Sequence, residues 1–178
     1  MDYGLAFLAA EPPDVVIFVD ADCQVQSGAI AQLTRQVLAT GRPAQATYLM
    51  TTPAIASAKD AVSGFAFKVK NLVRPLGLSR LGLPCLLTGT GMAFPWAVIR
   101  SVNVASADIV EDMKLSLDLT IAGSAPMYCP EALVLGSLPQ QGRAAQSQRT
   151  RWEHGHLQSI SRYVPKLIGV AIEKKRLS

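Results

Sequence analysis

The feature that most constrains the fold is a short apolar segment that ends in two acidic residues. The run from Val15 to Val19 is rich in β-branched side chains, which is typical of a strand buried on both faces of a parallel or mixed sheet. Asp20-Ala21-Asp22 follows directly, and a helix is then predicted with Ser27 as its N-cap and Gly41 as its end. A strand, an acidic turn and a helix in this order predict an α/β fold.

The same alternation continues along the chain. Further strands are expected at 46–50 and near Met127 and Leu133, and Leu86-Leu87 and Met92 to Phe94 flank a predicted Thr-Gly-Thr-Gly turn. Helices are expected at 55–73, from near Val110 to Gly123, through Trp152, and in a final amphipathic stretch within 159–178. The first two helices are expected to carry apolar faces, made of Ile30, Leu33, Val37 and Leu38 in the first and of Val62, Phe65, Val69 and Leu72 in the second. We expect residues 1–178 to form one domain, because 178 residues leave little room for a second core.

Composition excludes several classes of protein. Hydrophobic residues make up 49% and charged residues 17% of the chain, which excludes disorder. The net charge of +4 suits an anionic partner, but the basic residues lack interleaved aromatics, so we expect no nucleic acid. Cys23, Cys85 and Cys129 are widely separated, which argues against a zinc cluster or a disulfide framework. No export signal is expected, and the uncharged segment from Leu81 to Ile99 is interrupted by Gly and Pro, so we predict a buried loop and strand there.

Asp20 and Asp22 are candidate metal ligands. Residues i and i+2 share one side of a strand, so both carboxylates are expected to point beyond the carboxyl edge of the sheet. Carboxylate oxygens suit Mg²⁺ or Mn²⁺, which complete their coordination with water and substrate phosphates. Considered alone, the pair is more often a simple turn or helix cap.

Three further segments carry candidate site residues. Glu111-Asp112 lies at a predicted helix start, either as ordinary helix-end stabilisation or with a carboxylate that acts as a base. Thr88-Gly89-Thr90-Gly91 allows close backbone approach to a sugar or phosphate, or is a tight turn only. Gln148-Arg149-Thr150-Arg151-Trp152 offers groups for phosphate oxygens and a flat face for a sugar, or is a basic helix with one aromatic anchor. His154 and His156 are more often solvated side chains, with metal ligation by one of them as the alternative.

Taken in order, these motifs resemble those of processive family 2 glycosyltransferases such as cellulose, hyaluronan and poly-N-acetylglucosamine synthases. The resemblance runs from about Asp14 to about Leu157 and includes the D-x-D, G-T-G, E-D and Q-x-x-R-W elements. It implies an α/β domain of the GT-A type, with a mixed sheet flanked by helices, that takes part in polysaccharide biosynthesis. It also implies that the chain lacks the first nucleotide-binding strands, because nothing in Met1 to Pro13 matches them.

The resemblance implies a role for each site residue. Asp20 and Asp22 would hold Mg²⁺ or Mn²⁺ and the sugar diphosphate, and Asp112 would be the general base of an inverting transfer. The remaining residues would bind a nucleotide-diphosphate sugar, such as a UDP-sugar, and a saccharide or lipid-linked acceptor; they are Gly89, Thr90, Gly91, Glu111, Gln148, Arg149, Arg151 and Trp152.

Family members act at the cytoplasmic face of the bacterial inner membrane, and residues 163–176 resemble an interfacial helix that would rest on a membrane surface. An ordinary core-packing helix is the alternative for that segment, and a chain that is not anchored would be cytoplasmic. The alternatives for function are a non-catalytic sugar-nucleotide-binding fragment and, with less support, a nucleotidyltransferase.

Overall fold

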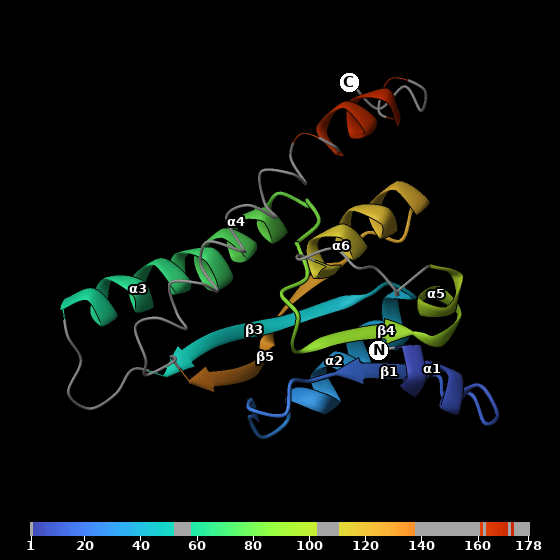
Figure 1. Cartoon of the computed structure of the whole chain (residues 1–178), viewed down its shortest axis with the longest axis horizontal. Coiled ribbons are helices and arrows are strands. Elements are labelled where there is room, and N and C mark those ends of the chain that lie inside the picture. The colour runs from blue at the N-terminus through green and yellow to red at the C-terminus, as the bar shows by residue number, and fades with distance from the viewer. Residues whose placement is uncertain are drawn as a thin grey trace.

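A computed structural model describes residues 2–51, 58–102, 111–137, 161, 163–170 and 172. These residues form a mixed five-stranded sheet with helices on both sides, in the strand order β1-β4-β3-β5-β2 (Figure 1). β3 and β5 are parallel, and the other neighbouring pairs are antiparallel. The predicted α/β class and mixed sheet are confirmed.

The strand before the acidic pair, β1 (Val15–Phe18), is less enclosed than predicted. It pairs antiparallel with β4 (Met92–Pro95), and Val16 is its one fully buried side chain. The prediction of a strand buried on both faces is therefore wrong. The partial exposure follows from its position at the end of the strand order, where the described residues place a neighbour on one side only.

The first predicted helix forms as α2 (Ala29–Thr40), with Gly41 in a left-handed conformation as its end. Two details of the prediction are wrong. Gly28, with φ 81°, holds the N-cap position instead of Ser27, and the structure shows no side-chain cap there. The buried face consists of Ala29, Leu33 and Val37, whereas Ile30 and Leu38 are exposed. The helix packs on the sheet through a narrower apolar face than the sequence suggests.

The sheet has an apolar core on each face. On one face α2 packs against small side chains of β3 (Ala44–Thr51), β4 and β5 (Met127–Ser137). On the other face, Met92 and Phe94 of β4 pack with α5 (Trp96–Ser101) and α6 (Glu111–Ala122). Ala93 lies between them in sequence and joins the first core, as expected from the alternation of side chains along a strand.

Two strands expected near Met127 and Leu133 are a single strand, β5, with an irregularity. Its register against β3 shifts between Ala46 and Thr47, whose partners are Cys129 and Leu133. Pro130 lies within the shift, and a proline has no N–H to give to the ladder. The loop and strand predicted within the uncharged segment from Leu81 to Ile99 are confirmed, because residues 81–91 are a loop and β4 follows directly.

The helix predicted at 55–73 is longer than expected and does not stop before Pro75. It runs as α3 (Ala58–Lys68), a π-helical segment η1 (Val69–Val73) and α4 (Arg74–Arg80), along one side of the molecule in Figure 1. The Arg74 N–H bonds to the Val69 carbonyl, five residues back, so the turn before Pro75 is wide. The predicted apolar stripe is not buried against the sheet: Val62, Phe65 and Val69 are exposed, and Leu72 is half-buried.

The remaining described elements are short. α1 (Asp2–Leu8) and β2 (Gln24–Val25) lie near the start of the chain, and residues 163–170 form a helix that agrees with the predicted amphipathic stretch. The predicted helix from near Val110 to Gly123 is confirmed as α6, although Val110 itself lies outside the described residues. Among the residues that the structure describes, we find no helix with both the length and the apolar character that crossing a bilayer requires.

Candidate functional site

The pairing of β1 with β4 brings the acidic loop to the glycine-rich loop. Phe18 at the end of β1 is the partner of Met92 at the start of β4. Two residues beyond this pair, the Asp20 N–H donates a hydrogen bond of 3.0 Å to Oγ1 of Thr90. Thr90 is fully buried, so its hydroxyl is a fixed anchor for the start of the acidic loop.

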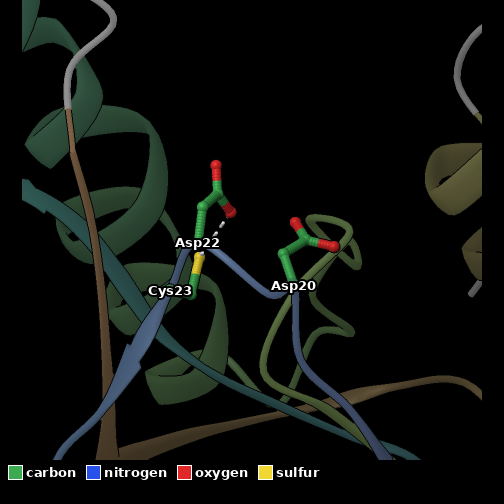
Figure 2. Close-up of side chains that lie close together, drawn as sticks. All are labelled: Asp20, Asp22 and Cys23. Carbon is green, nitrogen blue, oxygen red and sulfur yellow. Dashed lines mark hydrogen bonds between the residues drawn. The ribbon is translucent and has the colours of Figure 1, made fainter.

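Asp20, Asp22 and Cys23 gather their ligand atoms in one place. One carboxylate oxygen from each aspartate and the Cys23 sulfur all lie within 4.8 Å of one another (Figure 2). The predicted meeting of the two carboxylates is confirmed, but the reason given for it is wrong. The strand ends at Phe18, and Asp20 to Cys23 form a turn closed by a hydrogen bond from the Cys23 N–H to the Asp20 carbonyl.

This donor set fits a divalent cation of the Mg²⁺ or Mn²⁺ kind. Both aspartates are exposed, so their carboxylates remain open to water and to a ligand. Two carboxylates leave coordination positions for phosphate oxygens, as such ions prefer. Cys23, which the sequence did not indicate as a ligand, adds a softer donor that favours ions such as Zn²⁺ or Cd²⁺.

Cys23 connects the acidic turn to the sheet. Its sulfur lies within hydrogen-bond reach of Oδ1 of Asp22, at 3.7 Å, and of the Tyr48 hydroxyl of β3, at 3.9 Å. Burial raises the pKa of Tyr48 above its ordinary value, and Cys23 and the two aspartates act in the same direction. Tyr48 therefore stays neutral and presents a hydroxyl, and not a further negative charge, to the two aspartates of the turn.

The side chain of Gln45 in β3 forms hydrogen bonds to the backbone of the Thr-Gly-Thr-Gly loop. Gln45 was not predicted as a site residue. Gln45 is buried; its Nε2 donates to the Thr90 carbonyl at 2.9 Å, and its Oε1 accepts from the Thr88 N–H at 2.9 Å. Gly91 has a φ of 64°, and a Cβ there would lie 2.9 Å from the Ala46 Cβ. The loop is therefore a tightly packed turn, and only glycine fits at its last position.

The predicted base, Asp112, lies in the first turn of α6 and beside the same loop. A Cβ at Gly89 would lie 3.7 Å from Oδ2 of Asp112, so the loop backbone and the carboxylate are neighbours. Oδ1 accepts a hydrogen bond of 2.7 Å from the Met113 N–H. The acidic turn and Asp112 thus both border the glycine-rich loop.

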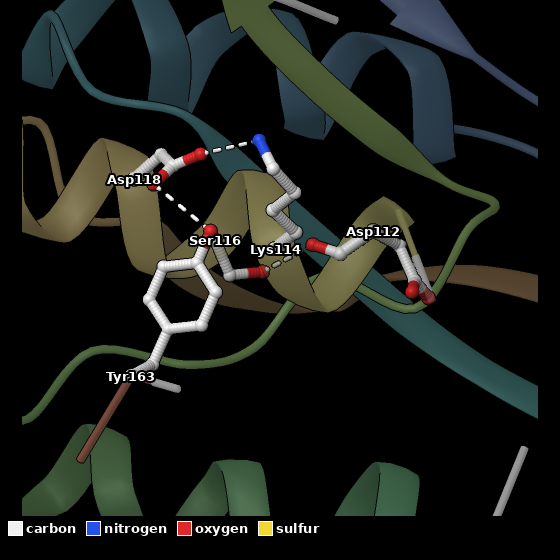
Figure 3. Close-up of polar contacts among 5 residues, drawn as sticks. All are labelled: Asp112, Lys114, Ser116, Asp118 and Tyr163. Carbon is white, nitrogen blue, oxygen red and sulfur yellow. Dashed lines mark hydrogen bonds and ion pairs between the residues drawn. The ribbon is translucent and has the colours of Figure 1, made fainter. Parts of the chain in front are cut away.

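Ser116 links α6 to the start of the loop through hydrogen bonds. It was not predicted as a site residue either. Its hydroxyl donates to the Asp112 carbonyl at 2.8 Å and accepts from the Leu87 N–H at 2.7 Å. Figure 3 shows Ser116 between Asp112 and a second polar group on the same helix. In that group Asp118 forms an ion pair with Lys114 at 2.8 Å and accepts a hydrogen bond from Tyr163 at 3.3 Å.

A basic residue of η1 lies close enough to Asp112 to affect its electrostatics. Partial burial of the ammonium group and the nearby positive charge of Arg74 lower the pKa of Lys70, whereas the negative charge of Asp112 raises it. Lys70 keeps part of its side chain exposed. Neither Lys70 nor Arg74 was indicated as a site residue, since a basic pair on a helix usually marks a solvated face.

Several predicted site residues lie outside the described residues. These are the Q-x-x-R-W segment, with Gln148, Arg149, Arg151 and Trp152, and the two histidines, His154 and His156. Glu111 is the first residue of α6, but the structure describes only its backbone. The described site therefore consists of the acidic turn, the glycine-rich loop, Asp112 and the residues that support them.

Residues 4–155 match a family of proteins described as glycosyltransferase-like family 2. Because this match covers most of the chain, the protein belongs to that family, and family membership implies glycosyltransferase activity. The mixed sheet flanked by helices is the α/β architecture consistent with a GT-A domain. No curated protein matches the chain significantly.

Proposed function

We propose that this protein transfers a sugar from a nucleotide-diphosphate sugar, most simply a UDP-sugar, to a saccharide or lipid-linked acceptor with inversion at the anomeric carbon. The observation that carries the proposal is the joining of three motifs that are far apart in sequence. The Asp20 amide bonds to Thr90, and Gly89 of the same loop borders the Asp112 carboxylate. Metal ligands and a base around one glycine-rich loop suit a displacement at a sugar diphosphate.

In this proposal Asp20 and Asp22 hold the divalent cation, and Thr90 fixes the turn that carries them. A bound Mg²⁺ or Mn²⁺ would supply positive charge to the diphosphate leaving group. Burial of Thr90 and Gln45 means that the loop is ordered before any ligand arrives. Such preorganisation favours catalysis, because the site need not rearrange during the reaction.

Asp112 is the proposed general base. Its carboxylate accepts the proton of an acceptor hydroxyl while the hydroxyl oxygen forms a bond to the anomeric carbon. The bond from that carbon to the diphosphate oxygen breaks, and the nucleotide diphosphate leaves with the electron pair. One displacement inverts the configuration, and no covalent intermediate with the protein is formed.

Other parts of the proposal rest on the motif resemblance. Gln148, Arg149, Arg151 and Trp152 would bind the diphosphate and the acceptor, and Glu111 would lie beside the base. A processive synthase of polysaccharide, acting at the cytoplasmic face of a bacterial inner membrane and anchored through a helix within 159–178, is the fuller form of the proposal. We also propose that residues 1–178 belong to a single catalytic domain.

Titration calorimetry and product analysis with UDP-sugars and Mn²⁺ test this function. The proposal predicts binding that needs Mn²⁺ and is lost in Asp22→Asn, together with release of UDP. Binding without turnover would favour a non-catalytic sugar-nucleotide-binding fragment. Release of pyrophosphate from a nucleoside triphosphate would favour a nucleotidyltransferase and contradict the proposal.

A further inference from the structure

The continuous helix α3–η1–α4 carries a row of exposed apolar side chains. Val62, Phe65, Val69 and Val73 follow one another at intervals of three or four residues, and Leu81 continues the row just beyond the end of α4, after a gap at Gly77. The exposed fraction is 69% for Phe65 and 68% for Val62. Single exposed apolar residues are ordinary, but a contiguous row on one helix marks an interaction surface.

The π-helical segment keeps this row on one face. In an α-helix, each four-residue step overshoots one turn by about 40°, so a row from Phe65 to Leu81 would wind around the helix. The π-helical turn of η1, in which the Arg74 N–H bonds to the Val69 carbonyl, has more residues per turn and so reduces this rotation. The row therefore stays straight enough to contact a flat surface.

Basic side chains line both edges of the row. Lys68 and Arg80 each precede a row residue by one position, whereas Lys70 and Arg74 each follow one, so the two pairs lie on opposite flanks. All four side chains are exposed. The segment 58–83 contains five Lys or Arg and one Asp, so the surface that surrounds the row is positive.

We propose that α3–η1–α4 docks on an anionic lipid surface, with the apolar row among the acyl chains and the basic flanks at the level of the lipid phosphates. An apolar face bordered by cations is the pattern of helices that lie in the membrane interface. A protein partner of acidic character would leave the straight, purely apolar row unexplained.

Flotation of the 178-residue chain with vesicles tests the inference without any sugar nucleotide. We expect binding to vesicles of phosphatidylcholine mixed with phosphatidylglycerol and much weaker binding to phosphatidylcholine alone. The double variant Phe65→Ser/Val69→Ser should bind the mixed vesicles at least about tenfold more weakly. Its matched control is Ile30→Ser/Leu38→Ser, which removes two exposed apolar side chains from α2 and should bind normally.

Charge reversal tests the basic flanks separately. Lys68→Glu/Arg80→Glu should weaken binding about tenfold or more, whereas Arg35→Glu on α2 should not. Circular dichroism and thermal unfolding establish that each variant is folded, which the exposure of the changed residues predicts.

Three outcomes would overturn the inference. The first is no vesicle binding by the unchanged chain. The second is binding that survives both double variants of α3–η1–α4 but is lost in Ile168→Ser, which would assign it to the helix of residues 163–170, where Val164 and Ile168 are exposed. The third is a dimer in light scattering that Phe65→Ser/Val69→Ser abolishes, which would make a second copy the occupant. Because flotation needs no turnover, its failure is distinguishable from failure of the proposed enzymatic activity.

Discussion

The backbone amide of Asp20 donates a hydrogen bond to the hydroxyl of Thr90, a residue 70 positions further along the chain. The bond continues the antiparallel pairing of β1 with β4 beyond the last ladder pair, Phe18 with Met92. Two motifs that are unremarkable alone thus become parts of one structure. The position of the acidic turn depends on a threonine that contributes nothing to the ligand set.

Thr90→Val should loosen the acidic turn. The substitution keeps the size of the buried side chain but leaves the Asp20 N–H without its partner, at an expected cost of about 1–3 kcal/mol. Urea unfolding measures the loss, and Mn²⁺ affinity should fall with it. Thr88→Val is the matched control, since the Thr88 hydroxyl is buried without a hydrogen-bond partner in the structure. Equal losses in the two variants would contradict the anchoring role of Thr90.

Gly91→Ala should be far more damaging than Gly41→Ala. Both glycines have a φ of 64°, so alanine incurs the same backbone strain at each position. At Gly41 the added Cβ meets open space, whereas at Gly91 it would lie 2.9 Å from Ala46 and 3.0 Å from Val134. We expect an additional loss of about 1–3 kcal/mol for Gly91→Ala in urea unfolding. A similar loss in both variants would mean that the loop has room to move.

Cys23 should be the thiol that reacts first in the native protein. It is partly exposed, whereas Cys85 and Cys129 are buried and burial raises the pKa of both thiols. Mass spectrometry after brief iodoacetamide treatment should show one modified cysteine in the native chain and three after denaturation. Cd²⁺ should slow the reaction of Cys23, and less so in Asp22→Asn, if the thiol shares a cation with the carboxylates.

Stability should fall at alkaline pH because of Cys85. Burial raises the pKa of this thiol from 9.0 to about 12, so the unfolded chain loses the proton first. The stabilisation is present below pH 9 and is lost as the pH rises towards 12, by about 1.4 kcal/mol at pH 10. The difference in urea stability between pH 8 and pH 10 should be smaller in Cys85→Ala by about that amount. An unchanged difference would show that Cys85 does not titrate as described.

Much of the fold and the core of the site were predictable from sequence. The run from Val15 to Val19 and the alternation after it gave the α/β class, and the order of the motifs indicated that Asp20, Thr90 and Asp112 belong together. Glycine readily adopts the left-handed conformation that ends a helix. Gly41 and Gly123 therefore marked the ends of two helices correctly.

The residues that support the site were not predictable. Gln45 and Ser116 are single polar residues inside otherwise apolar or helical segments, and only the folded chain shows that their hydrogen bonds hold the loop. The same limit applies to apolar residues on helices. Periodicity places Phe65 and Val69 on one face, but it does not say whether the face meets the sheet or another surface.

Pro75 misled the prediction for a related reason. A proline inside a helix normally clashes with the carbonyl of the preceding turn and ends the helix. Here the preceding turn is the wide π-helical segment, with Arg74 bonded to Val69, and the helix continues. No pattern in the sequence predicts a π-helical turn at this position.

Nucleotide release from UDP-sugars in the presence of Mn²⁺ tests the central claim most directly, with the unchanged chain compared with Asp112→Asn and Asp118→Asn. The two aspartates lie on the same helix, but Asp112 borders the glycine-rich loop and Asp118 pairs with Lys114. We predict release by the unchanged chain and by Asp118→Asn, and a loss of at least about 100-fold in Asp112→Asn. Release that is equal in Asp112→Asn and the unchanged chain would contradict the assignment of Asp112 as the base.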